Sequence, residues 1–362
     1  MKTKCFICNY KLTRVNNHYK KNVSSDIEPI SFYAKYYQVC FRCFYIKKNT
    51  NKNYQKNIDK IYKYYTDHSK FNTVDQKIIY TKHSRNRCEI IYNSFLKKFR
   101  AKKILDYGSG NGSMLYPFLK TKSKLFASDV KNNIGDKIRK NNKFKFISIK
   151  KLVHSIEKFD LIVSSHTFEH VINPLKTLRV FKSKLNKNGK IFIQIPDFKN
   201  NPFDLIIYDH AFHYSKGSIY KMARKCDLKV ELINDKKIFG EMSILLSNSN
   251  SAYKIMDNDF KNNLLKAFNF LNNFLKKIKR INKFSIFGTS IAALWVYSNF
   301  KNKIISFYDE DENKINQFFM EKKIKKINRN SREIIVLPFY EKKLQKVEER
   351  LIKKQSSLNL FY

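Results

Sequence analysis

The sequence contains no apolar run that approaches the length of a membrane span. It also lacks the apolar stretch of a signal peptide, because Cys5 and Cys8 stand where that stretch would begin. We therefore expect a soluble, cytoplasmic protein that does not insert into a membrane.

Acidic residues are scarce: 30 Asp and Glu stand against 73 Lys and Arg, which gives a formal net charge of +43 at pH 7. Such an excess can indicate nucleic-acid binding, but a binding surface forms a local stripe or patch of positive charge. Here the lysines occur along the whole chain together with abundant Asn, Ile, Phe and Tyr. An AT-rich coding sequence produces this composition, so we expect that nucleic acid is not the partner.

The chain of 362 residues is too long for one ordinary core, and its hydrophobic content of 43% predicts two or three packed domains. Strands alternate with helices from residue 103 onward, which predicts a parallel sheet with helices on both faces. The predicted strands are 103–107, 125–130, 144–149, 159–164 and 190–195. Helical spacing of apolar residues over 61–99 predicts two or three helices before them. A smaller βαβ unit follows, with predicted strands 284–287, 304–308 and 333–337.

Four of the six cysteines form two Cys-x-x-Cys pairs, Cys5 with Cys8 and Cys40 with Cys43. In a reducing compartment, paired cysteines are better interpreted as metal ligands than as disulfides. Two such pairs supply the four thiolates of a structural zinc site, which leaves no coordination position open for catalysis. We predict one Zn2+ ion here; a redox pair or unliganded core cysteines are the alternatives.

A glycine-rich turn, DYGSGNG (residues 106–112), follows the first predicted strand and opens a helix. Glycines allow the backbone to approach a ligand, and a helix N-terminus offers unpaired N–H groups. The spacing Gly-x-Gly-x-Gly differs from the Gly-x-Gly-x-x-Gly of dinucleotide-binding folds. Asp129 follows the second strand, where a carboxylate can bind ribose hydroxyls. The pattern predicts a ligand site, and a purely structural turn is the alternative.

A second polar segment, YDHAFHYS (residues 208–215), follows the fifth strand. Asp209, His210 and His213 can supply a base that works near neutral pH beside the ligand site. The sequence supports equally that these histidines are packed, hydrogen-bonded loop residues.

These motifs resemble the class I S-adenosylmethionine-dependent methyltransferases. ILDYGSGNG (residues 104–112) is similar to their first motif, and FDLIVSSHTFEHV (residues 159–171) to their fourth strand and its loop. The resemblance implies a Rossmann-like α/β core and S-adenosylmethionine as the cofactor. It also implies that three glycines line the methionine moiety and that one acid binds the ribose. The residues assigned to this pocket are Asp106, Gly108, Ser109, Gly110, Gly112, Asp129, Ser164 and His166.

The whole arrangement resembles the sugar C-methyltransferase family, which acts on nucleotide-linked deoxysugars. The similar segments are QVCFRC (residues 38–43), YKYYTDHS (residues 62–69) and the loop 209–215. The resemblance implies methylation of a carbon atom after enolate formation. The implied catalytic residues are His210 as the base, Asp209 as its orienting partner, and Tyr64 or Tyr65 as a further acid/base group. If His210 is not the base, His213 or His166 is the next candidate.

This interpretation divides the chain into a zinc-binding module with a linker (1–58), a methyltransferase domain (59–250), and a linker helix with a C-terminal Rossmann-like βαβ domain (251–362). The expected partner is a small-molecule acceptor, a nucleotide-linked sugar. O-methylation of a glycan precursor or another metabolite, RNA methylation, and binding without catalysis are the alternatives. In the C-terminal unit, Gly288 and Asp309 could bind a nucleotide, but a structural role is favoured because a single glycine is weak support.

Overall fold

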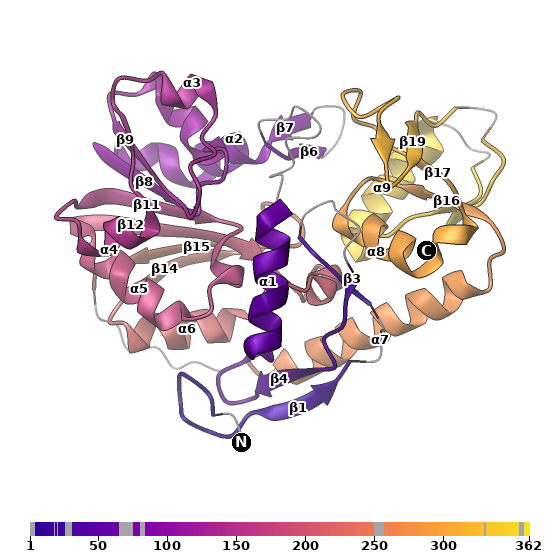
Figure 1. The fold of residues 1–362 in the computed structure, drawn as a ribbon, viewed down its shortest axis with the longest axis horizontal. Helices are drawn as coiled ribbons and strands as arrows, with labels where there is room; N and C mark the ends of the chain where they lie inside the picture. The colour runs from indigo at the N-terminus through magenta and orange to yellow at the C-terminus, as the bar shows by residue number, and fades with distance from the viewer. Residues whose placement is uncertain are drawn as a thin grey trace.

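The computed structural model describes residues 4–17, 19, 21–25, 31–64, 75–79, 84–249, 257–328, 331–354 and 358–362. Two large sheets lie in separate lobes, and the N-terminal strands and helix α1 (Lys52–Tyr64) lie between them toward the base of the view (Figure 1). Among the described residues, none of the helices has both the length and the apolar character needed to cross a bilayer.

The larger sheet has seven strands in the order β10-β9-β8-β11-β12-β15-β14. The strands are β8 (Lys103–Tyr107), β9 (Lys124–Ser128), β10 (Phe144–Phe146), β11 (Phe159–Ser165), β12 (Leu185–Pro196), β14 (Lys229–Asn234) and β15 (Glu241–Ser247). Strands β8 to β12 pair in parallel, whereas β15 is antiparallel to both of its neighbours. The five strands predicted between residues 103 and 196 are confirmed. The pair β14 and β15 was not predicted because an antiparallel pair at the end of the sheet continues no β/α alternation.

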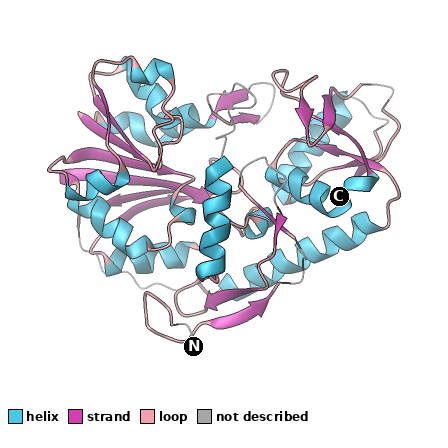
Figure 2. Ribbon diagram, in the orientation of Figure 1, coloured by secondary structure: helices cyan, strands magenta, loops and turns pink. Residues whose placement is uncertain are grey.

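Helices cover both faces of this sheet (Figure 2). One face carries α2 (Arg87–Ile91) and α3 (Asp136–Arg139), and the other carries α4 (Ile149–His154), α5 (Pro174–Ser183) and α6 (Lys216–Lys225). The helix predicted after the glycine-rich turn is a 3-10 helix, Ser113–Lys120, with Pro117 inside it. Before β8, a hairpin of β6 (Lys77–Ile79) and β7 (Ser84–Asn86) interrupts the predicted run of helices. Residues 65–74 and 80–83 of that run lie outside the described part of the chain.

The C-terminal sheet has the order β18-β19-β17-β16-β20-β21. Its elements are α7 (Phe260–Lys279), β16 (Phe284–Phe287), α8 (Ile291–Phe300), β17 (Ile304–Tyr308), β18 (Phe318–Phe319), β19 (Lys322–Lys325), β20 (Ile335–Val336), α9 (Glu341–Lys354) and β21 (Leu360–Phe361). The parallel strands β19-β17-β16-β20-β21 have the same chain order as β10-β9-β8-β11-β12. Gly288 N donates to Tyr308 O at 2.7 Å, as Gly108 N does to Ser128 O at 2.7 Å. This unit is therefore Rossmann-like and larger than the predicted βαβ unit.

The N-terminal residues form an antiparallel sheet of β1 (Thr13–Asn16), β4 (Tyr36–Cys40) and β5 (Tyr45–Lys48), to which β13 (Phe212–Tyr214) adds a fourth strand. Between β1 and β4 in the chain, β2 (Asn22–Val23) and β3 (Ser31–Phe32) form a short antiparallel pair of their own. Strand β13 belongs to the segment 59–250. The N-terminal module and the segment 59–250 therefore share a sheet. Pairing of β13 with β5 fixes the position of residues 208–215, the histidine-containing loop.

Candidate active site and metal centre

The glycine-rich turn connects β8 to the 3-10 helix and passes the end of β9. Gly108, Gly110 and Gly112 have φ angles of 71°, 49° and 83°, in the left-handed region that favours glycine. Gly110 N donates to Asp129 Oδ2 at 2.8 Å. The structure thus brings the predicted ribose-binding acid into direct contact with the turn.

Two glycines of the turn are also required by packing. A Cβ atom on Gly108 would lie 2.1 Å from Thr167 Cγ2, and one on Gly112 would lie 2.8 Å from Ile138 Cδ1. Thr167 Oγ1 in addition donates to Gly108 O at 3.1 Å. A side chain at Gly108 would therefore push the loop after β11 away from the turn.

Buried hydroxyl groups lie around the carboxyl ends of β8, β9 and β11. Ser109, Ser128 and Ser164 are 6%, 0% and 0% exposed, and their Oγ atoms have no hydrogen-bond partner among the described residues. Asp106 is also buried at the end of β8. Buried polar atoms are normally hydrogen-bonded, and ligands of open α/β sheets bind at the carboxyl ends of the strands. Together with the Asp129 carboxylate, these hydroxyls fit a polar ligand such as S-adenosylmethionine.

Asp204 was missed by sequence reasoning: it stands just before the histidine-containing loop (residues 208–215) and contacts both of its histidines. Its Oδ1 lies 2.6 Å from His210 Nδ1 and its Oδ2 lies 2.6 Å from His213 Nδ1. Burial opposes ionisation, but the contacts with His213 and His210 hold the pKa of Asp204 well below its usual range. Burial lowers the pKa of His213 to about 4. At pH 7 a carboxylate therefore accepts one hydrogen bond from each ring.

Asp209, which was predicted to orient His210, has different partners. Its carboxylate accepts hydrogen bonds from Ser25 N at 2.7 Å and Ser25 Oγ at 2.5 Å, and Oδ2 lies 3.3 Å from His170 Nδ1. The predicted pairing is thus replaced by Asp204 with His210 and Asp209 with His170. Adjacency in sequence suggested the first pairing, whereas the N-terminal module decides which way the Asp209 carboxylate is held.

His170, in the loop after β11, completes the group. Its ring centroid lies 4.7 Å from that of His210 and 6.5 Å from that of Tyr62 on α1. Among the described residues of the aromatic segment 62–69, Tyr62 is therefore a tyrosine that lies against the histidines. Tyr64 is the last residue of α1, and its side chain lies outside the described part, as does all of Tyr65.

His166 directly follows β11 with a φ of 49°, which is uncommon for a residue other than glycine. Its ring lies 3.4 Å from Glu169 Oε1 and 3.1 Å from Glu241 Oε2. Arg87 and Gln194 hold Glu241 at 3.4 Å and 2.7 Å. Burial and Arg87 oppose protonation, but Glu241 and Glu169 raise the pKa of His166 to about 9. His166 is therefore a cation at neutral pH and is poorly suited to act as a base.

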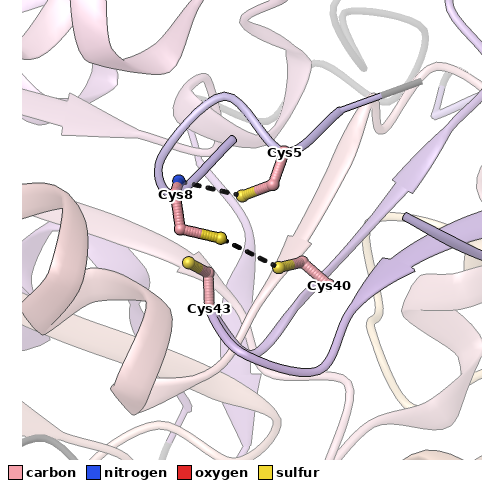
Figure 3. Close-up of side chains that lie close together, drawn as sticks. All are labelled: Cys5, Cys8, Cys40 and Cys43. Atoms are coloured by element: carbon pink, nitrogen blue, oxygen red, sulfur yellow. Dashed lines mark hydrogen bonds between the residues drawn. The ribbon is translucent and has the colours of Figure 1, made fainter. Parts of the chain in front are cut away.

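The four paired cysteines converge with their sulfur atoms within 4.8 Å of one another (Figure 3). Cys8 Sγ lies 3.8 Å from Cys40 Sγ, and tetrahedral Zn–S bonds of about 2.3 Å separate the sulfurs by about 3.8 Å. Each pair is followed by a residue with positive φ, Asn9 at 57° and Phe44 at 59°. Their N–H groups donate to Cys5 O at 2.9 Å and Cys40 O at 2.7 Å. The two turns share one backbone geometry, and the set fits a zinc ion.

Two further groups place possible ligand atoms within 4.8 Å of one another: Glu169 with His170 and His210, and Asp204 with His210 and His213. The hydrogen bonds to Asp204 account for the second group. In the first group, Asp209 and Asp204 occupy Nδ1 of the two histidines, so a cation would have to bind Nε2. The number of metal ions bound by the protein therefore decides whether His210 is free to act as a base.

A known protein family matches the segment that contains the glycine-rich turn and the histidine-containing loop. Residues 80–233 match the family described as "Methyltransferase domain", and the strand order and the contact of Asp129 with the glycine-rich turn agree with that match. This segment is an S-adenosylmethionine-dependent methyltransferase domain. The methyltransferase domain includes the glycine-rich turn, Asp129 and the whole histidine-containing loop.

A tRNA U34 carboxymethyltransferase from Campylobacter fetus subsp. fetus (strain 82-40) is 31% identical over 100 residues, which are 25% of this chain and 36% of that protein. The chain thus spans about a third of that relative's length. Because the relative is named as an enzyme of tRNA, the prediction that nucleic acid is not a partner finds no support in it.

Solved structures with similar folds include the Burkholderia thailandensis 1,6-didemethyltoxoflavin-N1-methyltransferase, with a TM-score of 0.37 and 11% identity over 45% of this chain and 76% of that chain. A Haloferax volcanii methyltransferase in complex with the Trm112 activator has a TM-score of 0.35 and 14% identity over 42% of this chain and 84% of that chain. Since both scores are low, the fold assignment rests on the strand order and on the domain match.

Proposed function

We propose that this chain transfers a methyl group from S-adenosylmethionine to a carbon atom of a nucleotide-linked deoxysugar in the cytoplasm. The observation that carries the proposal is the buried pair of Asp204 and His210 in the methyltransferase domain. The loop after β11 links this pair to the cofactor turn, because Thr167 contacts Gly108 and His170 lies against His210. In this proposal the chain consists of a zinc-binding module (1–58), a methyltransferase domain (59–250) and a C-terminal Rossmann-like domain with its linker helix (251–362).

The bound cofactor supplies an electrophilic methyl group, so the acceptor must provide a nucleophile. A carbon atom beside a carbonyl becomes nucleophilic when it loses its α-proton. His210 takes this proton at Nε2, because its Nδ1 hydrogen is donated to Asp204, and the ionised Asp204 stabilises the imidazolium that forms. Asp209 holds His170 beside this base. Tyr62, or Tyr64 or Tyr65, provides the further acid/base group at the acceptor.

The cofactor pocket is proposed to consist of the glycine-rich turn, Asp129 and the buried serines. Gly110 and Asp129 hold the ribose end, and Ser109 and Ser164 supply hydroxyl groups to the polar parts of the cofactor. His166 borders this pocket as a cation. The four cysteines hold a structural Zn2+ that takes no part in the chemistry.

His210→Ala tests the proposal. It should lower kcat by roughly 10²–10⁴-fold with unchanged cofactor affinity, and stop deuterium exchange at the acceptor α-carbon when the methyl donor is omitted. His154→Ala, at the exposed end of α4, is the matched control. Product mass spectrometry with a panel of nucleotide-linked 4-keto-deoxysugars identifies the acceptor. Full turnover in His210→Ala would place the base elsewhere.

The metal content gives an independent check on the role of His210. We expect one equivalent of zinc, which Cys40→Ser removes. A second equivalent of metal that persists in Cys40→Ser would make His210 a ligand and contradict its role as a base.

A tRNA is the second candidate acceptor, because the similar Campylobacter protein is named as a tRNA enzyme and the chain carries a net charge of +43. Methyl transfer from labelled cofactor to total tRNA, measured over a series of salt concentrations, tests this candidate. If the acceptor proves to be a glycan precursor without a carbonyl, His210 would deprotonate a hydroxyl group and the product would be an O-methyl ether.

A further inference from the structure

A lysine of the N-terminal module lies inside the histidine-containing loop. Lys48 is the last residue of β5 and is 1% exposed, and its backbone N donates to Ala211 O at 3.0 Å. Its Nζ lies 2.5 Å from Ile207 O, 2.9 Å from His210 O and 3.0 Å from His213 Nε2. An ammonium group has three N–H donors and no acceptor. Each of the three N–H groups of Lys48 therefore has one acceptor, so the buried ammonium is fully hydrogen-bonded.

This contact determines where the protons of two histidines lie. Because the ammonium can only donate, His213 Nε2 must accept, and the ring hydrogen of neutral His213 is therefore on Nδ1. Nδ1 then donates to Asp204 Oδ2. The ionised Asp204 has no proton to give, so its Oδ1 accepts from His210 Nδ1. Nε2 of neutral His210 is thereby left without a hydrogen.

We propose that Lys48 is a positioning residue that, through His213 and Asp204, holds His210 in the tautomer whose Nε2 is free to accept a proton. This inference rests on the proposed role of His210 as the base. The N-terminal module then takes part in the reaction, because Lys48 is the last residue of β5. This strand begins two residues after Cys43.

The surroundings of Lys48 support this role. The charged and titratable groups that face it are Asp204, Asp209, His210, His213 and the ring of Tyr37, whose centroid lies 5.6 Å from Nζ. Burial lowers the pKa of Lys48 to about 7, although the two carboxylates oppose this. The ammonium form therefore predominates below pH 7 and is lost as the pH rises above it.

The experiment compares the zinc-loaded full chain with its Lys48→Met variant by long-range proton–nitrogen NMR of histidines labelled at the ring nitrogens. In the wild type we expect a hydrogen on Nδ1 and none on Nε2 for the neutral rings of both His213 and His210. In Lys48→Met, His213 Nε2 loses its donor, so His213 should change tautomer and the signal of His210 should change with it. Lys47→Met is the matched control, because Lys47 precedes Lys48 in the same strand and packs on Phe212, 5.9 Å from its ring.

Turnover gives the second readout. Lys48→Met should lower kcat by roughly 10–10²-fold, less than loss of the base itself, and change the pH dependence of kcat while cofactor affinity and zinc content stay the same. Lys48→Gln keeps an uncharged NH2 group as a donor and should recover part of the loss.

A hydrogen on Nε2 of the neutral form of His213 or of His210 in the wild type would overturn the inference even if no Lys48 variant folds. An unchanged tautomer and pH profile in Lys48→Met would overturn it as well. The NMR measurement needs no acceptor. Absence of methyl transfer to any sugar would therefore refute the proposed function separately.

Discussion

His213 connects protonation to stability at the scale of a single residue. Burial lowers the pKa of the folded residue to about 4, whereas the ordinary value is 6.5. Between these values the unfolded chain binds a proton that the folded chain does not. Stability is therefore lost as the pH falls from about 6.5 to 4, and the gap corresponds to about 3 kcal/mol.

Replacing His213 with Gln should remove this acid-induced loss. We expect the free energy of unfolding of wild-type protein to fall by about 3 kcal/mol more than that of His213→Gln between pH 6.5 and pH 4. Urea denaturation at several pH values measures the difference, and the exposed His154→Gln is the control. Parallel pH dependences for wild type and His213→Gln would show that His213 does not titrate differently in the folded state.

Asp129 is the second residue whose role can be isolated. Its Oδ2 accepts from Gly110 N, and its Oδ1 accepts from Val130 N at 2.5 Å. Asp129→Ala removes both the acceptor for the turn and the proposed acceptor for the ribose. Because hydrogen bonds to charged groups contribute about 1.5–3 kcal/mol, cofactor affinity should fall by roughly 10–10²-fold. Calorimetric titration measures it with Asp136→Ala in α3 as the control, and unchanged affinity would remove Asp129 from the site.

The two cysteine turns act at the scale of the element. Cys40 ends β4, and Cys43 lies between β4 and β5, so one pair of ligands fixes the hairpin that carries Lys48. Binding of a structural metal ion adds directly to folding stability. The zinc site should therefore stabilise the hairpin more than any single side chain in it.

Cys40→Ser should accordingly reduce bound zinc to less than about half an equivalent and lower the melting temperature. Elemental analysis and thermal denaturation measure the two effects. Cys226→Ser is the control, because Cys226 is buried and its Sγ contacts Leu175 O, away from the cluster. A protein that carries no zinc before substitution would refute the site.

At the scale of the whole molecule, the C-terminal unit is tied to the N-terminal module. Trp295 on α8 donates from Nε1 to Lys21 O at 2.8 Å, and its ring centroid lies 5.9 Å from that of Tyr19. Lys21 Nζ in turn donates to Ser298 O. The N-terminal module therefore contacts both Rossmann-like lobes, through β13 on one side and α8 on the other.

Trp295 is the single tryptophan of the chain, so its fluorescence reports on this contact. Removal of zinc by a chelator should loosen the N-terminal module, admit water to Trp295 and shift its emission to longer wavelength. The same treatment of Cys40→Ser should give no further shift. Zinc loss without any change in emission would show that the contact at Trp295 is independent of the metal.

Several features were determined by the sequence alone. Apolar runs bounded by turn residues defined the five parallel strands, and the spacing of Cys5, Cys8, Cys40 and Cys43 defined the sulfur cluster, because both are local patterns. The position of Asp129 after its strand likewise placed an acid at the predicted ligand site, since neighbouring parallel strands end at the same edge of a sheet.

Only the tertiary structure decided how the candidate base is held. Asp204 stands six residues before His210 in a segment that carries no motif. Lys48 also carries no motif, and it reaches His210 and His213 through a sheet that joins β5 to β13, more than 160 residues apart. The sequence predicts three strands of the C-terminal unit, but only the tertiary structure shows that this unit repeats the strand order of the larger sheet. One glycine and one acid are all that its turn retains, which is too little to reveal the repeat. The physical reason is burial, because a charged side chain removed from water needs hydrogen-bond or ion partners. For Lys48, those partners come from a segment that is distant in sequence and close only in the fold.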